Sequence, residues 1–275
     1  MKLTINIVTA GRIEVFKQCC LSVVEALPHH AEVLVIVNGD CPEAIRFLTQ
    51  LNHPQFRWIQ TPRERLARSR NRALLIAQGE ILYCLDDDVV VPRSLFSEAL
   101  QQFDENPELS VVGGPNLTPP GSPFLERAFG NVMTSWFACP MVRQRYMDCR
   151  IKRVDGEQDL IFCNLAVRRN ALGELRFAEH LRSNEENLFL YLARRRQLKI
   201  RFSPSLYVYH RRRKTLATFA AQVFSYGIGR AQQTLVEPVS CHPAFLAPSA
   251  ACLTLAAALL VPRSMVFVGP LLLTY

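Results

Sequence analysis

Three consecutive carboxylates are the part of this sequence best suited to chemistry. Asp86, Asp87 and Asp88 follow directly on the apolar run 81–85. Adjacent carboxylates repel one another, and a hard divalent cation is the usual reason for a protein to hold them together. On an extended segment Asp86 and Asp88 share one side and can serve one cation, directly or through water. The alternative is a solvated turn, or a cap for a helix at Pro92.

Five arginines crowd the stretch before this apolar run: Arg63, Arg65, Arg68, Arg70 and Arg72. Guanidinium forks suit the oxygens of a diphosphate. A basic helix face can also be merely solvated. Together with the acid triplet, however, the arginines predict a diphosphate site that a cation completes.

Strand and helix patterns alternate along residues 1–115, which predicts a βαβ, mostly parallel α/β sheet. Strands are expected at 3–8, 31–37, 56–60, 81–85 and 109–112, and helices at 16–27, 42–52, 66–77 and 92–103. Acids at the carboxyl end of a buried strand lie where such sheets bind their ligands. Residues 116–165 are less regular, with a helix expected at 124–137, and a further strand is expected at 161–167.

A second acidic group, Glu185-Glu186, lies at the start of an expected helix. Ser183 as N-cap and Glu186 at N3 fit a capping box. Short strands are expected at 199–202 and 206–209. Residues 187–236 hold ten Lys and Arg and no Asp or Glu.

The composition limits the class of protein. The 275 residues carry a formal charge of +8 with a pI near 9.2, which suits nucleic acid, anionic lipid or a phosphorylated ligand. Nine cysteines without a C-x-x-C pair indicate reduced thiols in a reducing compartment. The first ten residues contain no long apolar region, so no secretory signal is expected.

The uncharged stretch 240–262 is about long enough to cross a bilayer, which needs roughly 20 residues. The apolar stretch 265–275 is too short to do so alone. The basic region before the span predicts a catalytic part on the cytosolic side. An apolar stripe on 216–224 fits a helix lying on the anionic leaflet, or one packed on the domain.

In combination these motifs resemble family 2 glycosyltransferases, which have the GT-A fold. The resemblance rests on Arg70-Asn71, on Ala77-x-Gly79-Glu80-Ile81 and on Leu85-Asp86-Asp87-Asp88. Further similar segments are Ile5–Arg12 (the first strand and nucleotide-contacting turn), Val35–Asp40 (the second strand), Glu185-Glu186 (the acidic pair with the catalytic base), Leu206–His210 (a strand ending in histidine) and Tyr226-Gly227-x-Gly229-Arg230 (a segment of members with C-terminal membrane helices).

The resemblance implies inverting transfer from a nucleotide-diphosphate sugar. Mg²⁺ or Mn²⁺ would be held by Asp86, Asp88 and His210, although a packed histidine is the equal alternative for His210. The donor would be contacted by Thr9, Arg12, Asn38, Asp40, Arg70, Asp86 and Asp87. Alignment favours Glu186 as the base, whereas the capping box would free Glu185 for that role.

Two departures from the family pattern bear on specificity. Val37 stands where the family usually has an acid that helps to hold the base, so the nucleotide is not fixed. No clear Q-x-x-R-W motif is present, which favours addition of a single sugar.

We therefore expect a GT-A domain at 1–210, divided into a nucleotide-sugar half (1–115) and an acceptor half (116–210). A basic amphipathic interfacial segment (211–239) and a membrane-associated or transmembrane segment (240–275) follow. The expected role is transfer to a lipid-linked or polysaccharide acceptor at the cytosolic face of the inner (cytoplasmic) membrane.

Two other classes of protein are weaker fits. A nucleotidyltransferase of related fold would show a Gly-rich, basic loop after the first strand, and residues 9–12 are too sparse for one. A non-catalytic basic protein binding anionic lipid or nucleic acid would leave the acids unexplained. No nucleic-acid or protein partner is expected.

Overall fold

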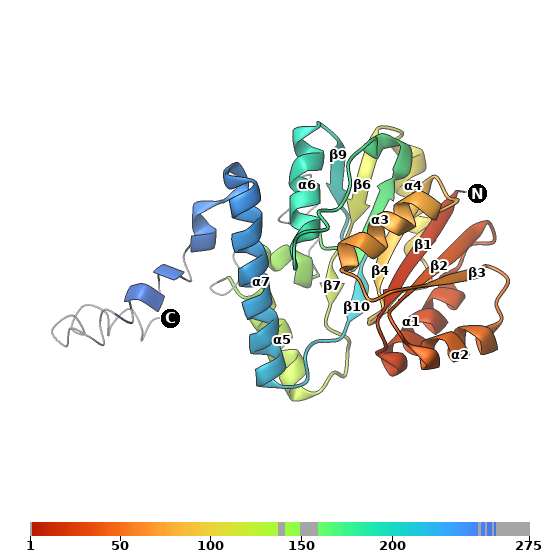
Figure 1. The fold of residues 1–275 in the computed structure, drawn as a ribbon, viewed down its shortest axis with the longest axis horizontal. Coiled ribbons are helices and arrows are strands. Elements are labelled where there is room, and N and C mark those ends of the chain that lie inside the picture. Colours follow the sequence, from red (N-terminus) through yellow and green to blue (C-terminus); the bar gives the residue numbers. More distant parts are fainter. Residues whose placement is uncertain are drawn as a thin grey trace. The chain divides into compact units, whose positions relative to one another are not determined.

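A seven-stranded, mostly parallel sheet forms the centre of the protein (Figure 1). The computed structural model describes residues 2–136, 141–148, 159–246, 249–250, 252–254 and 256. The strand order is β3-β2-β1-β4-β8-β6-β9, and β8 alone runs antiparallel to its neighbours. The strands are β1 (Leu3–Thr9), β2 (Ala31–Asn38), β3 (Phe56–Thr61), β4 (Ile81–Asp86), β6 (Leu109–Gly113), β8 (Asn164–Arg168) and β9 (Lys199–Phe202).

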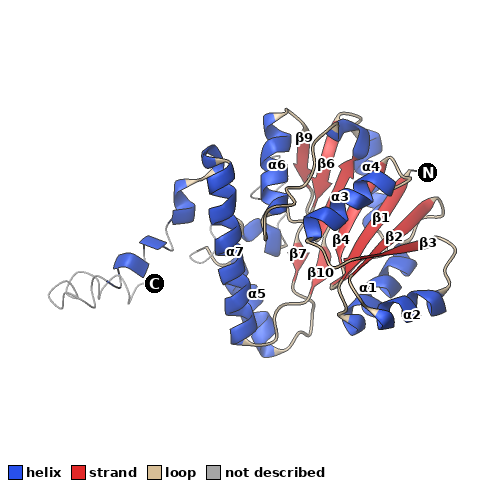
Figure 2. Ribbon diagram, viewed as in Figure 1, coloured by secondary structure: helices blue, strands red, loops and turns tan. Residues whose placement is uncertain are grey.

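Helices cover both faces of this sheet and make a three-layer α/β/α arrangement (Figure 2). One face packs against α1 (Ile13–Ala26), α2 (Pro42–Leu51) and α4 (Leu95–Glu105). The other packs against α3 (Leu66–Ile76) and α6 (Glu185–Arg195). The predicted α/β class, with a mostly parallel sheet flanked by helices, is confirmed.

Strand β4 shows why the apolar run before the acids is continuous. Tyr83 and Leu85 enter the core on one face, whereas Leu82 and Cys84 enter the core on the other. A strand buried on both faces needs apolar residues at every position. The run therefore ends where the strand reaches the edge of the sheet, at Asp86.

A smaller three-stranded sheet was not predicted. It has the order β5-β10-β7, with β5 (Val89–Val90), β10 (Val208–His210) and β7 (Asn116–Leu117). His210 pairs with Val89, so β10 runs beside the strand that follows the acid triplet. This pairing brings His210 to the acids from far along the chain.

Besides α1–α4 and α6, the chain contains further helices. They are α5 (Phe124–Thr134) and α7 (Leu216–Val236), with short 3-10 helices at η1 (Arg143–Tyr146), η2 (Arg169–Leu172), η3 (Pro238–Ser240) and η4 (Pro243–Leu246). On the apolar stripe of α7, Phe219 stacks on Phe129 of α5 with ring centroids 4.3 Å apart, whereas Leu216 and Phe224 are exposed. The contacts within the chain separate it into residues 1–230 and 231–275.

Within the described residues, no helix combines the length and apolar character that crossing a membrane requires. Residues 247–248, 251, 255 and 257–262 of the expected span 240–262 lie outside those residues, as does all of 265–275.

Asn164 ties the two sheets together at the start of β8. Tyr83 donates from its hydroxyl to Asn164 Oδ1 (2.6 Å), and Asn164 Nδ2 donates to the carbonyl oxygens of Leu206 (2.5 Å) and Pro115 (3.4 Å). All of these groups are buried, so each bond replaces water that cannot enter.

We predict that Tyr83→Phe lowers the free energy of unfolding by about 1–3 kcal/mol, because it leaves the buried Asn164 Oδ1 without a donor. Urea denaturation of both proteins measures this difference. Tyr191→Phe is the matched control: its half-buried hydroxyl makes no hydrogen bond with the described residues, so the change should stay within about 0.5 kcal/mol. Equal costs for the two variants would contradict the role of Asn164.

Candidate active site

The acid triplet lies at the carboxyl edge of the sheet, beside the turn that follows β1. Asp86 ends β4, and Asp87 and Asp88 form the turn into β5. The register pairs β1 and β4 in parallel up to their ends, so Thr9 and Arg12 reach the acids. Thr9 Oγ1 donates to Asp87 Oδ2 at 2.8 Å, and the Arg12 guanidinium donates to Asp87 and Asp88.

Asp87 and Asp88 differ in pKa because their neighbours differ. Burial raises the pKa of Asp87 to about 6, assisted by the charge of Asp88 and opposed by Arg12. Burial also acts to raise the pKa of Asp88. The positive charges of His210 and Arg12, with the hydrogen bond from Arg12, outweigh that effect, and the pKa of Asp88 lies well below its usual range.

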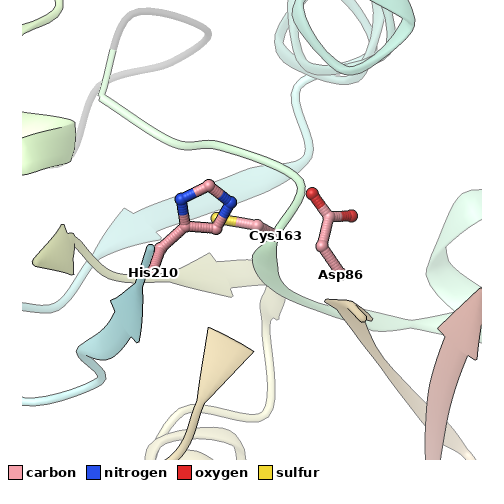
Figure 3. Close-up of side chains that lie close together, drawn as sticks. All are labelled: Asp86, Cys163 and His210. Carbon is pink, nitrogen blue, oxygen red and sulfur yellow. The ribbon is translucent and has the colours of Figure 1, made fainter. Parts of the chain in front are cut away.

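His210 completes a group of donor atoms that suits a divalent cation. Ligand atoms of Asp86, His210 and Cys163 all lie within 4.8 Å of one another (Figure 3). Asp88 Oδ1 lies 3.1 Å from His210 Nε2, but it is buried without an aligned hydrogen-bond donor. A bound cation would satisfy a buried carboxylate oxygen that lacks a hydrogen-bond donor. The predicted metal residues Asp86, Asp88 and His210 are thus brought together.

Cys163 is a member of this group that the sequence did not indicate. Burial raises the pKa of its thiol far above the usual range, so the thiol remains protonated and is a poor ligand for a hard cation. It lies at the end of an apolar run with no metal-ligand spacing, and only the antiparallel course of β8 brings it here.

Arg70 joins the acid triplet to the second acidic group. This buried residue of α3 donates from Nη2 to Asp86 Oδ1 (2.9 Å) and from Nη1 to Glu185 Oε1 (2.6 Å). Its guanidinium carbon lies 3.7 Å from the centroid of the Phe162 ring. The next residue, Asn71, exchanges two hydrogen bonds with the backbone of Phe177 (2.8 and 2.9 Å), which fixes the segment leading to α6.

The two glutamates have different surroundings. Glu185 is buried, and its burial raises its pKa to about 7, assisted by the negative charge of Glu186 and opposed by Arg70. Glu186 is half-buried, and its side chain makes no hydrogen bond or ion pair with the described residues.

The predicted capping box is wrong. The N-cap of α6 is Asn184 rather than Ser183, and no side chain caps the helix. Ser183 Oγ instead donates to the carbonyl oxygen of Ser225, at 2.8 Å.

A cavity of about 570 Å³ opens in front of the acid triplet. The predicted site residues that line it are Arg12, Asn38, Asp86, Asp87, Asp88 and His210. Both sides of the Asn38 amide bond the backbone of Glu64, at 2.8 and 2.9 Å. Asp40 is exposed and lies outside the lining, as do Thr9, Arg70, Glu185 and Glu186.

Apart from Arg70, the arginines of the cluster at 63–72 divide into two groups. Arg63 and Arg65 line the cavity and donate to backbone carbonyl oxygens. Arg68 and Arg72 pair with Glu64. Additional cationic residues of the lining come from later in the chain: Arg182, Arg211, Arg212 and Arg213.

Comparison with known proteins gave two kinds of match. Residues 4–176 match the family model described as Glycosyl transferase family 2. The solved structure of mannosyltransferase PcManGT from Pyrobaculum calidifontis, in complex with GDP-Man and Mn²⁺, has a TM-score of 0.69 at 18% identity, over 100% of this chain and 81% of that one.

S. aureus TarS 1-349 in complex with UDP-GlcNAc has a TM-score of 0.60 at 17% identity, over 78% of this chain and 60% of that one. The chain therefore spans about three fifths of the TarS structures that it matches. Comparison with curated protein sequences gave no match. At these identities the likeness shows a shared GT-A-like fold.

We predict that Glu185→Gln changes the slope of stability against pH. Because the pKa of Glu185 rises from 4.5 unfolded to about 7 folded, the folded state binds the extra proton in this window. Wild-type stability should thus fall as pH rises from about 5 to about 7.

The variant cannot titrate at this position, so its melting temperature should fall less steeply over that range than that of the wild type. Calorimetry of both proteins at several pH values measures the slopes. Parallel curves would contradict a raised pKa at Glu185.

Proposed function

The chain belongs to glycosyl transferase family 2, and on that basis we propose that it moves a sugar from a nucleotide-diphosphate donor to an acceptor hydroxyl, with inversion at C1. The family and the glycosyltransferase class expected from the sequence are thereby confirmed. The observation that carries the proposal is Arg70, which bonds Asp86 on one side and Glu185 on the other. One guanidinium thus joins the donor-side acids to the acidic pair proposed to serve the acceptor.

The donor is proposed to place its diphosphate against the acid triplet. The cavity there is lined by Arg12 and by the arginines at 63 and 65, whose charges suit phosphate oxygens. Support also comes from the similar structures, since TarS was solved with UDP-GlcNAc and PcManGT with GDP-Man and Mn²⁺.

Asp86, Asp88 and His210 would hold the divalent cation, Mg²⁺ or Mn²⁺. When bound, the cation supplies Lewis-acid stabilisation of the charge that develops on the leaving diphosphate. Arg12 adds fixed positive charge at the same edge, because Thr9 and the end of β1 hold its turn beside the acids.

Glu186 is proposed as the general base that takes the acceptor proton. Its carboxylate is half-buried and makes no hydrogen bond or ion pair with the part of the chain described, so it is free to accept a proton. Glu185 is instead committed to Arg70. Its pKa near 7 suits a base at neutral pH, which keeps it the second candidate.

The acceptor is proposed to be lipid-linked or part of a polysaccharide, at the cytosolic face of the inner membrane. The support is in the sequence: the stretch 240–262 carries no charge, and residues 187–236 hold cations but no acids. The family and this location together support a role in glycolipid or cell-surface polysaccharide assembly.

We predict that a nucleotide sugar raises the melting temperature only together with the cation. A panel that includes UDP-GlcNAc and GDP-Man, with and without Mn²⁺, tests this by thermal shift. A donor at a hundred times its Kd stabilises by about 2.7 kcal/mol. Asp88→Asn should lose the Mn²⁺-dependent part, whereas a shift equal in both proteins would contradict the metal site.

We predict that Glu186→Gln lowers kcat by about 10²–10⁴-fold while donor affinity stays unchanged, because a general base acts on the acceptor proton alone. Steady-state kinetics and donor titration measure the two effects. If Glu185→Gln gives this result while Glu186→Gln remains active, the base is Glu185. Equal loss of donor binding and turnover in both variants would contradict a base in this pair.

A further inference from the structure

At Gly229, helix α7 packs tightly against the segment that precedes α6. A Cβ placed on Gly229 would lie 2.7 Å from the carbonyl oxygen of Ser183 and 2.8 Å from its carbonyl carbon, and would also clash with Ser183 Oγ. The atoms at 2.7 and 2.8 Å belong to backbone, which cannot rotate away as a side chain can. Only glycine therefore allows α7 to pack against residue 183.

The same segment is bonded to the backbone of α7 about one turn before this contact. Ser183 Oγ donates to the carbonyl oxygen of Ser225 (2.8 Å), and Asn184 Nδ2 donates to that of Tyr226 (3.3 Å). Two hydrogen bonds and one close backbone contact thus join residues 183 and 184 to about one turn of α7, residues 225–229.

Asn184 needs this support because of its backbone. It has a left-handed conformation with φ of 65°, which an L-residue adopts at a cost unless its surroundings hold it there. Asn187 Nδ2 donates to Asn184 Oδ1 (3.0 Å), so the side chain is fixed from α6 as well as from α7. The residue directly after this turn is Glu185, followed by Glu186.

We propose that Gly229, Ser183 and Asn184 are positioning residues for the acidic pair, and that α7 sets the direction in which α6 presents it. This inference rests on the proposed function. None of the three residues needs to touch the donor, because they act through the backbone turn that starts α6. Gly229 of the Tyr226-Gly227-x-Gly229 motif is thereby given a role at the catalytic site.

A matched pair of glycines in α7 tests the proposal. Gly229→Ala and Gly227→Ala bring the same gain in helix propensity, but a Cβ on Gly227 meets no atom within 4 Å. Gly229→Ala should lower kcat on the order of a hundredfold, the usual effect of misplacing a catalytic group by about 1 Å. Its donor Kd should stay within about twofold, while Gly227→Ala keeps both constants.

If Gly229→Ala does not fold, Asn184→Gly takes its place. Glycine keeps the left-handed turn but removes the bonds to Tyr226 and Asn187, so kcat should again fall while donor Kd holds. A folded Gly229→Ala protein with wild-type kcat would overturn the inference, as would equal loss of donor binding and kcat. Absence of transfer by the wild-type chain from every nucleotide sugar would instead overturn the proposed function.

Discussion

The buried guanidinium of Arg70 is the interaction on which the candidate site depends. It lies against the Phe162 ring and bonds two carboxylates from segments about a hundred residues apart, Asp86 and Glu185. Its planar fork presents separate Nη donors to the two carboxylates in a fixed geometry, which the single ammonium of a lysine lacks. Arg70 and Glu185 are both buried, and removing one partner of a buried ion pair costs about 3–5 kcal/mol.

The surrounding structure holds Arg70 from several directions. Its helix, α3, packs on the sheet face that also carries α6, and the adjacent Asn71 fixes the backbone at Phe177. On the other side of α6, α7 contacts the turn at Ser183 and Asn184. The position of the acidic pair is therefore set by the fold as a whole, because its helix begins between two other helices.

Local patterns predict the first half of this fold well because three of its strands, β1, β2 and β4, are buried on both faces. The run before Asp86 is apolar at every position, and its end marks the edge of the sheet. The second sheet could not be predicted in this way, since strands as short as Asn116–Leu117 show no periodicity. The absence of the capping box could not be predicted either, because Ser183 donates to Ser225, which only tertiary packing brings near it.

Strand β8 has a consequence for where functional groups can arise. In a wholly parallel sheet, one rim receives only the last residues of each strand. Strand β8 lies between β4 and β6 and runs antiparallel to both. Its first residues therefore lie at the edge of the sheet where β4 and β6 end, and Cys163, directly before β8, lies there too. A single antiparallel strand thus places residues from the start of a strand at the ligand-binding edge of the sheet. It increases the number of sequence positions at which substitutions can change specificity.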